Sequence, residues 1–232
     1  MKARPSLKPH QTSLVVAGFA TLLGFWVPFV RQALLPIAYL NTHLHEMSHA
    51  LVAEATGAQV QGIDVYANGS GVTPVVGGNL LLIASAGYVG ASIFGAAMIY
   101  FGRTEKLARA TLATLAVLLT CSMLLWVRGD VVGVVSGIGW IAVLGVVAVF
   151  VRGRPLMFIC QFLGLQQCLN AVQSLFVLVD LSAGTELHSD ASILQSVTGI
   201  PSILWALGWS ALSLFLVFVT LRVAWQDRTA KP

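Results

Sequence analysis

Charged residues are scarce in this sequence of 232 residues. Asp, Glu, Lys and Arg make up 9% of it, whereas hydrophobic residues make up 57% and the mean hydropathy is +0.84. Because soluble domains carry about 25% charged residues, a soluble protein of this size could not cover its surface with so few. The sequence therefore predicts an integral membrane protein, with lipid around much of the chain.

Cysteine motifs, extended basic patches and internal repeats are also missing. Cys121, Cys160 and Cys168 fall inside apolar runs and have no C-x-x-C spacing, which favours a packing role over metal binding. The net charge of +4 comes from short clusters of Lys and Arg between the apolar runs. Such clusters are typical of membrane flanks rather than of a nucleic-acid-binding surface. We therefore expect a lipid bilayer, and no nucleic acid, among the partners.

Several apolar runs are long enough to cross a bilayer as helices, which takes about 20 residues. The last run is long enough to tilt or to begin as an interfacial turn, and Pro201 lies in its first part. The sequence predicts an all-α polytopic membrane protein of six to seven transmembrane helices. We expect one domain over residues 1–232, with a basic N-terminal tail over 1–11, in a bacterial inner membrane. The runs are 12–30, 34–57, 80–101, 107–127, 131–151, 156–181 and 193–223.

Residues 58–78 interrupt this helical pattern. Runs rich in β-prone residues flank Asn68-Gly69, and this combination predicts a β-hairpin. A hairpin beside an active site would offer an edge to which an unwound substrate strand adds through main-chain hydrogen bonds. The alternative is that the hairpin only connects two helices.

The second apolar run contains the sequence His45-Glu46-Met47-Ser48-His49, an H-E-x-x-H motif. On a helix, positions i and i+4 share a face, so both imidazoles can bind one Zn²⁺. Glu46 can accept a proton from the water that this metal activates. A carboxylate in an apolar run costs about 2.5–3.5 kcal/mol unless it is compensated, and the run holds no Lys or Arg. This favours a metal site over a chance match or a structural ion pair.

Two neighbouring polar residues are weaker candidates for the same site. His43 lies two residues before His45 and points to nearly the opposite side of the helix. Glu54 returns to the face of His45, but nearer to the end of the helix, where a solvated flank residue is expected.

The motif and three later features together resemble the M50 metallopeptidases, the site-2-protease-like intramembrane zinc proteases, and above all their M50B-like branch. The matching stretches are HEMSHALVAEATG, the GSGVTPVVGG hairpin, the SAGYVGAS helix start and HSDASILQSVTGIPSILWALGW at 188–209. The resemblance covers about half the chain. It implies a zinc site within the bilayer, with His45 and His49 as ligands and Glu46 as general base. It also implies that the protein cleaves peptide bonds in or near transmembrane segments of membrane proteins.

The resemblance also implies that a later aspartate is the third zinc ligand. Asp190, in Ser-Asp-Ala, matches the M50B-like segment and is the favoured ligand, the alternative being a helix N-cap. Asp180, at the end of the sixth run, is the main alternative, followed by His188 and Glu186. The N-P…L-D-G motif of better-known site-2 proteases is absent, and Asn170 fits either an oxyanion donor or a helix–helix contact.

The prediction is therefore a zinc metalloprotease that acts on membrane protein or peptide substrates. The alternatives are a non-catalytic binding or regulatory module of the same fold, a metal or proton transporter, and a zinc hydrolase of non-peptide bonds. The orientation depends on the number of spans. With seven, the N-terminus and the hairpin share a side that carries four Lys and Arg against nine on the other. This count puts the hairpin outside, whereas the basic N-terminus favours the reverse.

Overall fold

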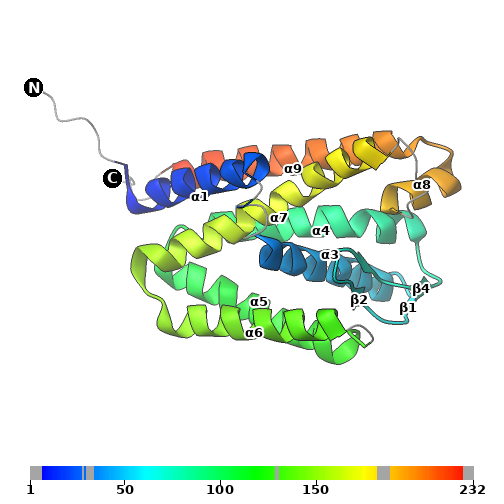
Figure 1. The fold of residues 1–232 in the computed structure, drawn as a ribbon, viewed down its shortest axis with the longest axis horizontal. Coiled ribbons are helices and arrows are strands. Elements are labelled where there is room, and N and C mark those ends of the chain that lie inside the picture. The colour runs from blue at the N-terminus through cyan, green and yellow to red at the C-terminus, as the bar shows by residue number, and fades with distance from the viewer. Residues whose placement is uncertain (1–6, 28, 30–33, 129–130, 182–188, 227–232) are drawn as a thin grey trace, which may run out of the picture.

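The computed structural model describes residues 7–27, 29, 34–128, 131–181 and 189–226, and they form a bundle of long helices with a β excursion at one end (Figure 1). The helices are α1 (Pro9–Trp26), α3 (Leu35–Ala55), α4 (Leu80–Phe101), α5 (Glu105–Leu125), α6 (Val131–Phe150), α7 (Gly153–Leu181), α8 (Asp190–Thr198) and α9 (Ser202–Trp225). Local signals set several helix starts. The side chains of Asn79 and Thr104 accept backbone N–H bonds at the first turns of α4 and α5.

Within the described residues, four helices, α4, α5, α6 and α9, are long and apolar enough to cross a membrane. The chain is thus mainly helical, as predicted, but the count of six to seven spans is not confirmed. The predicted run over 193–223 is divided between two helices, because α8 ends at Thr198 and α9 begins at Ser202. Gly199 has φ of 73°, a left-handed conformation that ends helices, and Pro201 follows it.

The β excursion lies directly after α3, where the hairpin was predicted. Its outer strands β1 (Gln59–Val60) and β4 (Val75–Val76) pair antiparallel, and so do its inner strands β2 (Asp64–Val65) and β3 (Gly71–Val72). At the tip, the Tyr66 N–H donates to the Ser70 carbonyl, with Gly69 at φ of 86°. The N–H of Ile63 donates to the Trp126 carbonyl at 2.9 Å, which fixes the hairpin to the end of α5.

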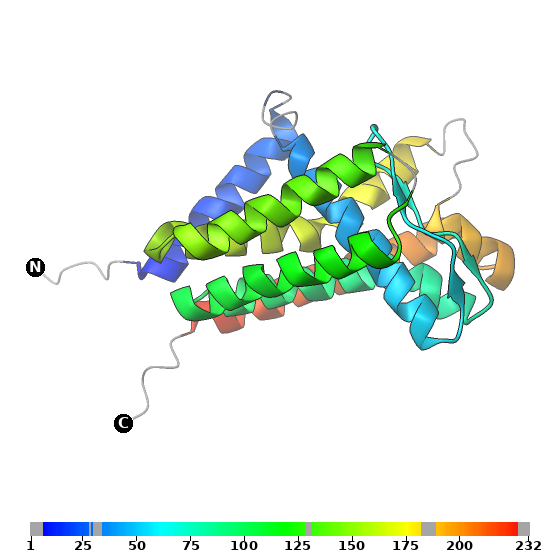
Figure 2. The ribbon, with the colours of Figure 1, turned by 90° about the horizontal axis from the view of Figure 1, so that it is seen from below.

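Helix α3 lies at the centre of the bundle, between α4, α6 and α7 (Figure 2). Its residues Leu40, Leu44 and Met47 belong to the largest buried apolar cluster, together with residues of α4, α5, α6 and α7. This packing buries the H-E-x-x-H motif near the hairpin end of the molecule and holds it on a rigid element.

Candidate metal centre

The two histidines of the motif lie one helical turn apart on α3 and face the same side. Their Nε2 atoms are 3.0 Å apart, and the side chains are nearly buried. The Nδ1–H of His49 donates to the Ile83 carbonyl of α4 at 2.6 Å. Hydrogen bonds of this kind fix the tautomer and ring orientation of metal-binding histidines, so the Nε2 of His49 is left to face the site.

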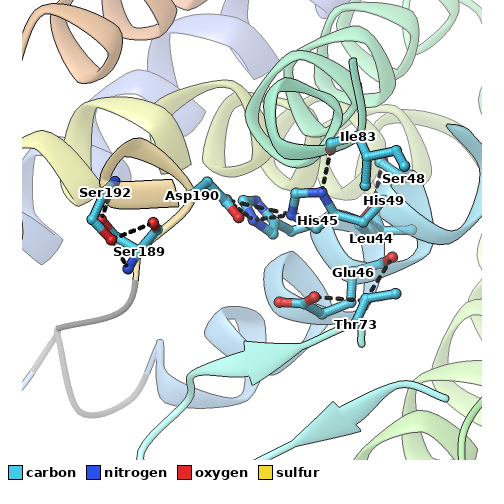
Figure 3. A network of polar contacts seen from close by, with 10 residues as sticks. All are labelled: Leu44, His45, Glu46, Ser48, His49, Thr73, Ile83, Ser189, Asp190 and Ser192. Atoms are coloured by element: carbon cyan, nitrogen blue, oxygen red, sulfur yellow. Dashed lines mark hydrogen bonds and ion pairs between the residues drawn. The ribbon is translucent and has the colours of Figure 1, made fainter. Parts of the chain in front are cut away.

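Asp190 brings a carboxylate to the same point from the first residue of α8. Its Oδ2 lies 3.1 Å from His45 Nε2 and 3.3 Å from His49 Nε2 (Figure 3). The N-cap of α8 is Ser189, whose side chain accepts the Ser192 N–H while the Ser192 hydroxyl accepts the Ser189 N–H. Because Ser189 caps the helix, the carboxylate of Asp190 is available to face the histidines.

The electrostatics of Asp190 suit a metal ligand. Burial raises the pKa of its carboxyl, but the adjacent His49 and His45 outweigh this and hold that pKa well below its usual range. The carboxylate is therefore ionised at neutral pH, which is the form that binds a metal.

The three donor atoms have the spacing of a zinc site. One atom each from His45, His49 and Asp190 lie within 4.8 Å of one another. Tetrahedral ligands at about 2.0–2.2 Å from Zn²⁺ are roughly 3.3–3.6 Å apart, and the observed separations of 3.0–3.3 Å are close to this. Two imidazoles and a carboxylate are also a common catalytic donor set, with a fourth position for water.

Glu46 lies beside this cluster, against the hairpin (Figure 3). Its side chain is 5% exposed, and the Thr73 hydroxyl donates to its Oε2 at 2.7 Å. Gly71 approaches so closely that a Cβ atom there would lie 2.7 Å from Glu46 Oε1. Gly71 of β3 and Thr73, directly after β3, therefore position the carboxylate predicted to be the general base.

Helix α4 forms the opposite wall of the site through Gly87 and Tyr88. A Cβ atom at Gly87 would lie 2.3 Å from His45 Nε2 and 2.5 Å from His49 Nε2. The Tyr88 ring packs edge-on against His45, with ring centroids 4.5 Å apart, and stacks on Trp209 of α9. Gly87, Tyr88 and Thr73 were not identified as site residues from the sequence, since glycine, tyrosine and threonine carry no metal-binding pattern.

The other candidates divide into those outside the site and those outside the described residues. His43 is buried on the far side of α3, where its Nε2 lies 3.0 Å from the Ser136 hydroxyl of α6. Glu54 is exposed near the end of α3. Residues Glu186 and His188, and the side chains of Asp180 and Asn170, lie outside the described part of the structure.

A comparison with protein families finds a match over most of the chain. The family described as Peptidase M50B-like matches residues 15–220, which include the motif, the hairpin and Asp190. Searches of curated proteins and of solved structures find no significant match.

Proposed function

Because this chain belongs to the M50B-like peptidase family, we propose that it is a zinc metalloprotease that hydrolyses peptide bonds in or near transmembrane segments of membrane proteins. One observation carries the proposal. His45 and His49 of α3 and Asp190 of α8, 145 residues from His45 in the sequence, meet with donor-atom spacings suited to one metal ion. Glu46 lies one residue from the first ligand, at the end of a bundle with four membrane-length helices.

The residues of the chain have separate roles in this mechanism. His45, His49 and Asp190 hold the zinc ion, which when bound lowers the pKa of a water molecule and polarises the scissile carbonyl. Glu46 accepts the proton of the attacking water and passes it to the leaving amine. The Thr73 hydroxyl, bonded to Glu46 Oε2, keeps this carboxylate in one orientation.

The hairpin gives the substrate a place to bind. The strand side formed by β1 and β2 is fixed to α5 through Ile63 and Trp126. On the other side, β3 and β4 pair with no further strand within the described residues, and Thr73 between them contacts Glu46. A substrate segment that adds to this edge is extended, so that its peptide carbonyls are exposed next to the site.

Metal content of the purified protein is the first test. We expect about one zinc ion per chain in the wild type, and its loss in His45→Ala and in Asp190→Ala. Asp180→Ala is the matched control, because it removes the aspartate that competes for the third position, and it should retain the metal. A folded wild type without zinc would contradict the proposal, and loss of zinc in Asp180→Ala but not in Asp190→Ala would reassign the third ligand.

A second experiment separates catalysis from metal binding. Glu46→Gln keeps the size of the side chain but removes the base, so the variant should retain zinc while cleavage falls roughly 10²–10⁴-fold. The assay uses single-span test substrates with a Gly- and Pro-rich unwound segment, in detergent micelles, with products identified by mass. Full activity of Glu46→Gln would show that this mechanism is wrong.

A further inference from the structure

The described basic residues are concentrated at one end of the bundle. Figure 1 shows the start of α1, the α4–α5 and α6–α7 connections and the end of α9 at the end of the bundle away from the hairpin. Seven of the eight described Lys and Arg lie in or beside these segments, whereas Arg128 follows α5 at the hairpin end. The seven are Lys8, Arg103, Lys106, Arg109, Arg152, Arg154 and Arg222. We call the end that carries them the basic end.

Hydrogen bonds bring the helix termini of the basic end together. The Gln11 side chain of α1 donates to the Trp225 carbonyl at the end of α9. Arg103, between α4 and α5, donates to the Val223 carbonyl of α9. Arg109 of α5 donates to the Val151 carbonyl just after α6. The start of α1 and the α4–α5 and α6–α7 connections therefore share one end with the C-terminus of α9.

The opposite end holds the metal centre. The hairpin is bonded there to the end of α5 through Ile63 and Trp126, and Asp190 of α8 contacts the histidines of α3. Arg128 has a local role at this end, because its guanidinium donates to the Leu124 and Leu125 carbonyls at the C-terminus of α5.

This arrangement removes a conflict in the charge pattern. A count of seven spans places the N-terminus on the same side as the hairpin. The basic residues of the N-terminus and those of the helix connections then favour opposite orientations in the membrane. In the structure, Lys8 precedes the start of α1, and the contact of Gln11 with Trp225 sets that start at the basic end. The basic N-terminus and the basic connections consequently favour the same orientation.

We propose that the basic end faces the cytoplasm and that the metal centre opens toward the opposite face of the membrane. Cytoplasmic connections of membrane proteins carry the excess of Lys and Arg, and short connections follow this rule most closely. Given the proposed protease activity, the substrates are membrane segments that are unwound and cut near their non-cytoplasmic end.

Labelling of introduced cysteines with a membrane-impermeant maleimide tests the orientation without any assay of activity. Ser70→Cys places a thiol at the exposed hairpin tip, and Leu7→Cys places one at the basic end without removing a charge. Both are made in a Cys121→Ala background, because Cys121 is the exposed native cysteine whereas Cys160 and Cys168 are buried. The background chain alone is the blank.

We expect Ser70→Cys to react in intact cells and Leu7→Cys to react only after lysis. The reverse pattern, or reaction of both in intact cells, would overturn the orientation. A C-terminal fluorescent protein gives a readout that does not depend on thiol access. It should fluoresce if the C-terminus is cytoplasmic, and loss of fluorescence together with activity of an alkaline phosphatase fusion would also overturn the proposal.

The position of the cut tests the substrate class. Two single-span test substrates, identical except that the unwound segment lies at the cytoplasmic or at the non-cytoplasmic end, are co-expressed with the wild type and with Glu46→Gln. Cleavage of the second substrate by the wild type is expected, and cleavage confined to the first would overturn the substrate class. Failure to cut either, with the labelling pattern as expected, would instead contradict the protease activity.

Discussion

Helices α3 and α6 have nearly equal lengths, 21 and 20 residues. They differ in that α3 carries polar residues and is largely buried, whereas α6 is apolar and largely exposed. From Asn41 to Ala50 of α3, all residues but Thr42 are buried, and this stretch carries both histidines of the motif and Glu46. Helix α6 is almost entirely apolar, yet only 22% of its most apolar window is buried. In lipid, apolar side chains are tolerated at the surface and polar groups must find partners inside. The buried helix is therefore the polar one.

The largest effect is expected when one methyl group is added to a glycine that faces the histidines of α3, and it is compared with the same change at a glycine of α6. Gly87→Ala should remove the proposed metal and reduce cleavage by at least 100-fold, because the new Cβ would lie 2.3–2.5 Å from Nε2 of His45 and of His49. Gly139→Ala on α6 is the matched control, since a Cβ there meets nothing within 4 Å. Zinc content and cleavage rate measure both. Equal zinc in the two variants would contradict the site geometry.

A smaller effect is expected from truncating one apolar side chain in each helix. Leu40→Ala in α3 empties a fully buried position and should cost about 2 kcal/mol of stability, the low end for such changes because lipid solvates the unfolded segment well. Val135→Ala in α6, at a position 64% exposed, should cost less than about 0.5 kcal/mol. Unfolding in mixed detergent measures both, and equal costs would mean that α6 is as tightly packed as α3.

Substitutions of Thr73 test the hydrogen bond to the Glu46 carboxylate of α3, and not the packing of that helix. Thr73→Val removes the hydrogen bond to Glu46 while keeping the volume, and should lower kcat about tenfold, equivalent to about 1.4 kcal/mol, with zinc retained. Thr73→Ser keeps the hydroxyl and should restore most of the rate. A loss of equal size in Thr73→Ser would assign Thr73 a packing role instead.

The smallest expected effect is at the polar contact that joins the two helices. Ser136→Ala removes the hydroxyl that contacts the buried imidazole of His43 from α6 and should cost about 0.6–1 kcal/mol. Cleavage at saturating substrate should not change, because His43 faces away from the metal centre. A fall in kcat with unchanged stability would show that His43 acts on the site.

The sequence predicts the long helices well, because uninterrupted apolar runs both signal and require helices in lipid. The run over 80–101 coincides with α4 at both ends. The run over 193–223 misleads for the same reason. Apolar residues continue through Ile200, although Gly199 and Pro201 end one helix and start another. The Gly-x-Pro punctuation is visible in the sequence and is a better guide there than hydropathy.

The residues of the site also divide into those that the sequence predicts and those that depend on tertiary contacts. His45, Glu46 and His49 follow from the periodicity of one helix, whereas Asp190 depends on a tertiary contact across 145 residues and was singled out only by resemblance to a family. Gly87 and Thr73 matter through the atoms that they place next to a ligand or a base. No local pattern encodes such contacts. The roles of His45, His49 and Asp190 as ligands stay predictions that metal content tests, and the role of Glu46 stays a prediction that the cleavage assay tests.

The break at Gly199–Pro201 has a consequence for how the molecule would respond to the proposed metal. Asp190 belongs to a nine-residue helix of its own, and its contacts with His45 and His49 join that helix to α3. An ion bound there would link α8 to α3, and it would stabilise the arrangement in which Asp190 contacts the histidines by mass action. Chelation should consequently accelerate hydrogen exchange in α8 and leave α5 and α6 unchanged, so that occupancy can be followed in the backbone amides of one short helix.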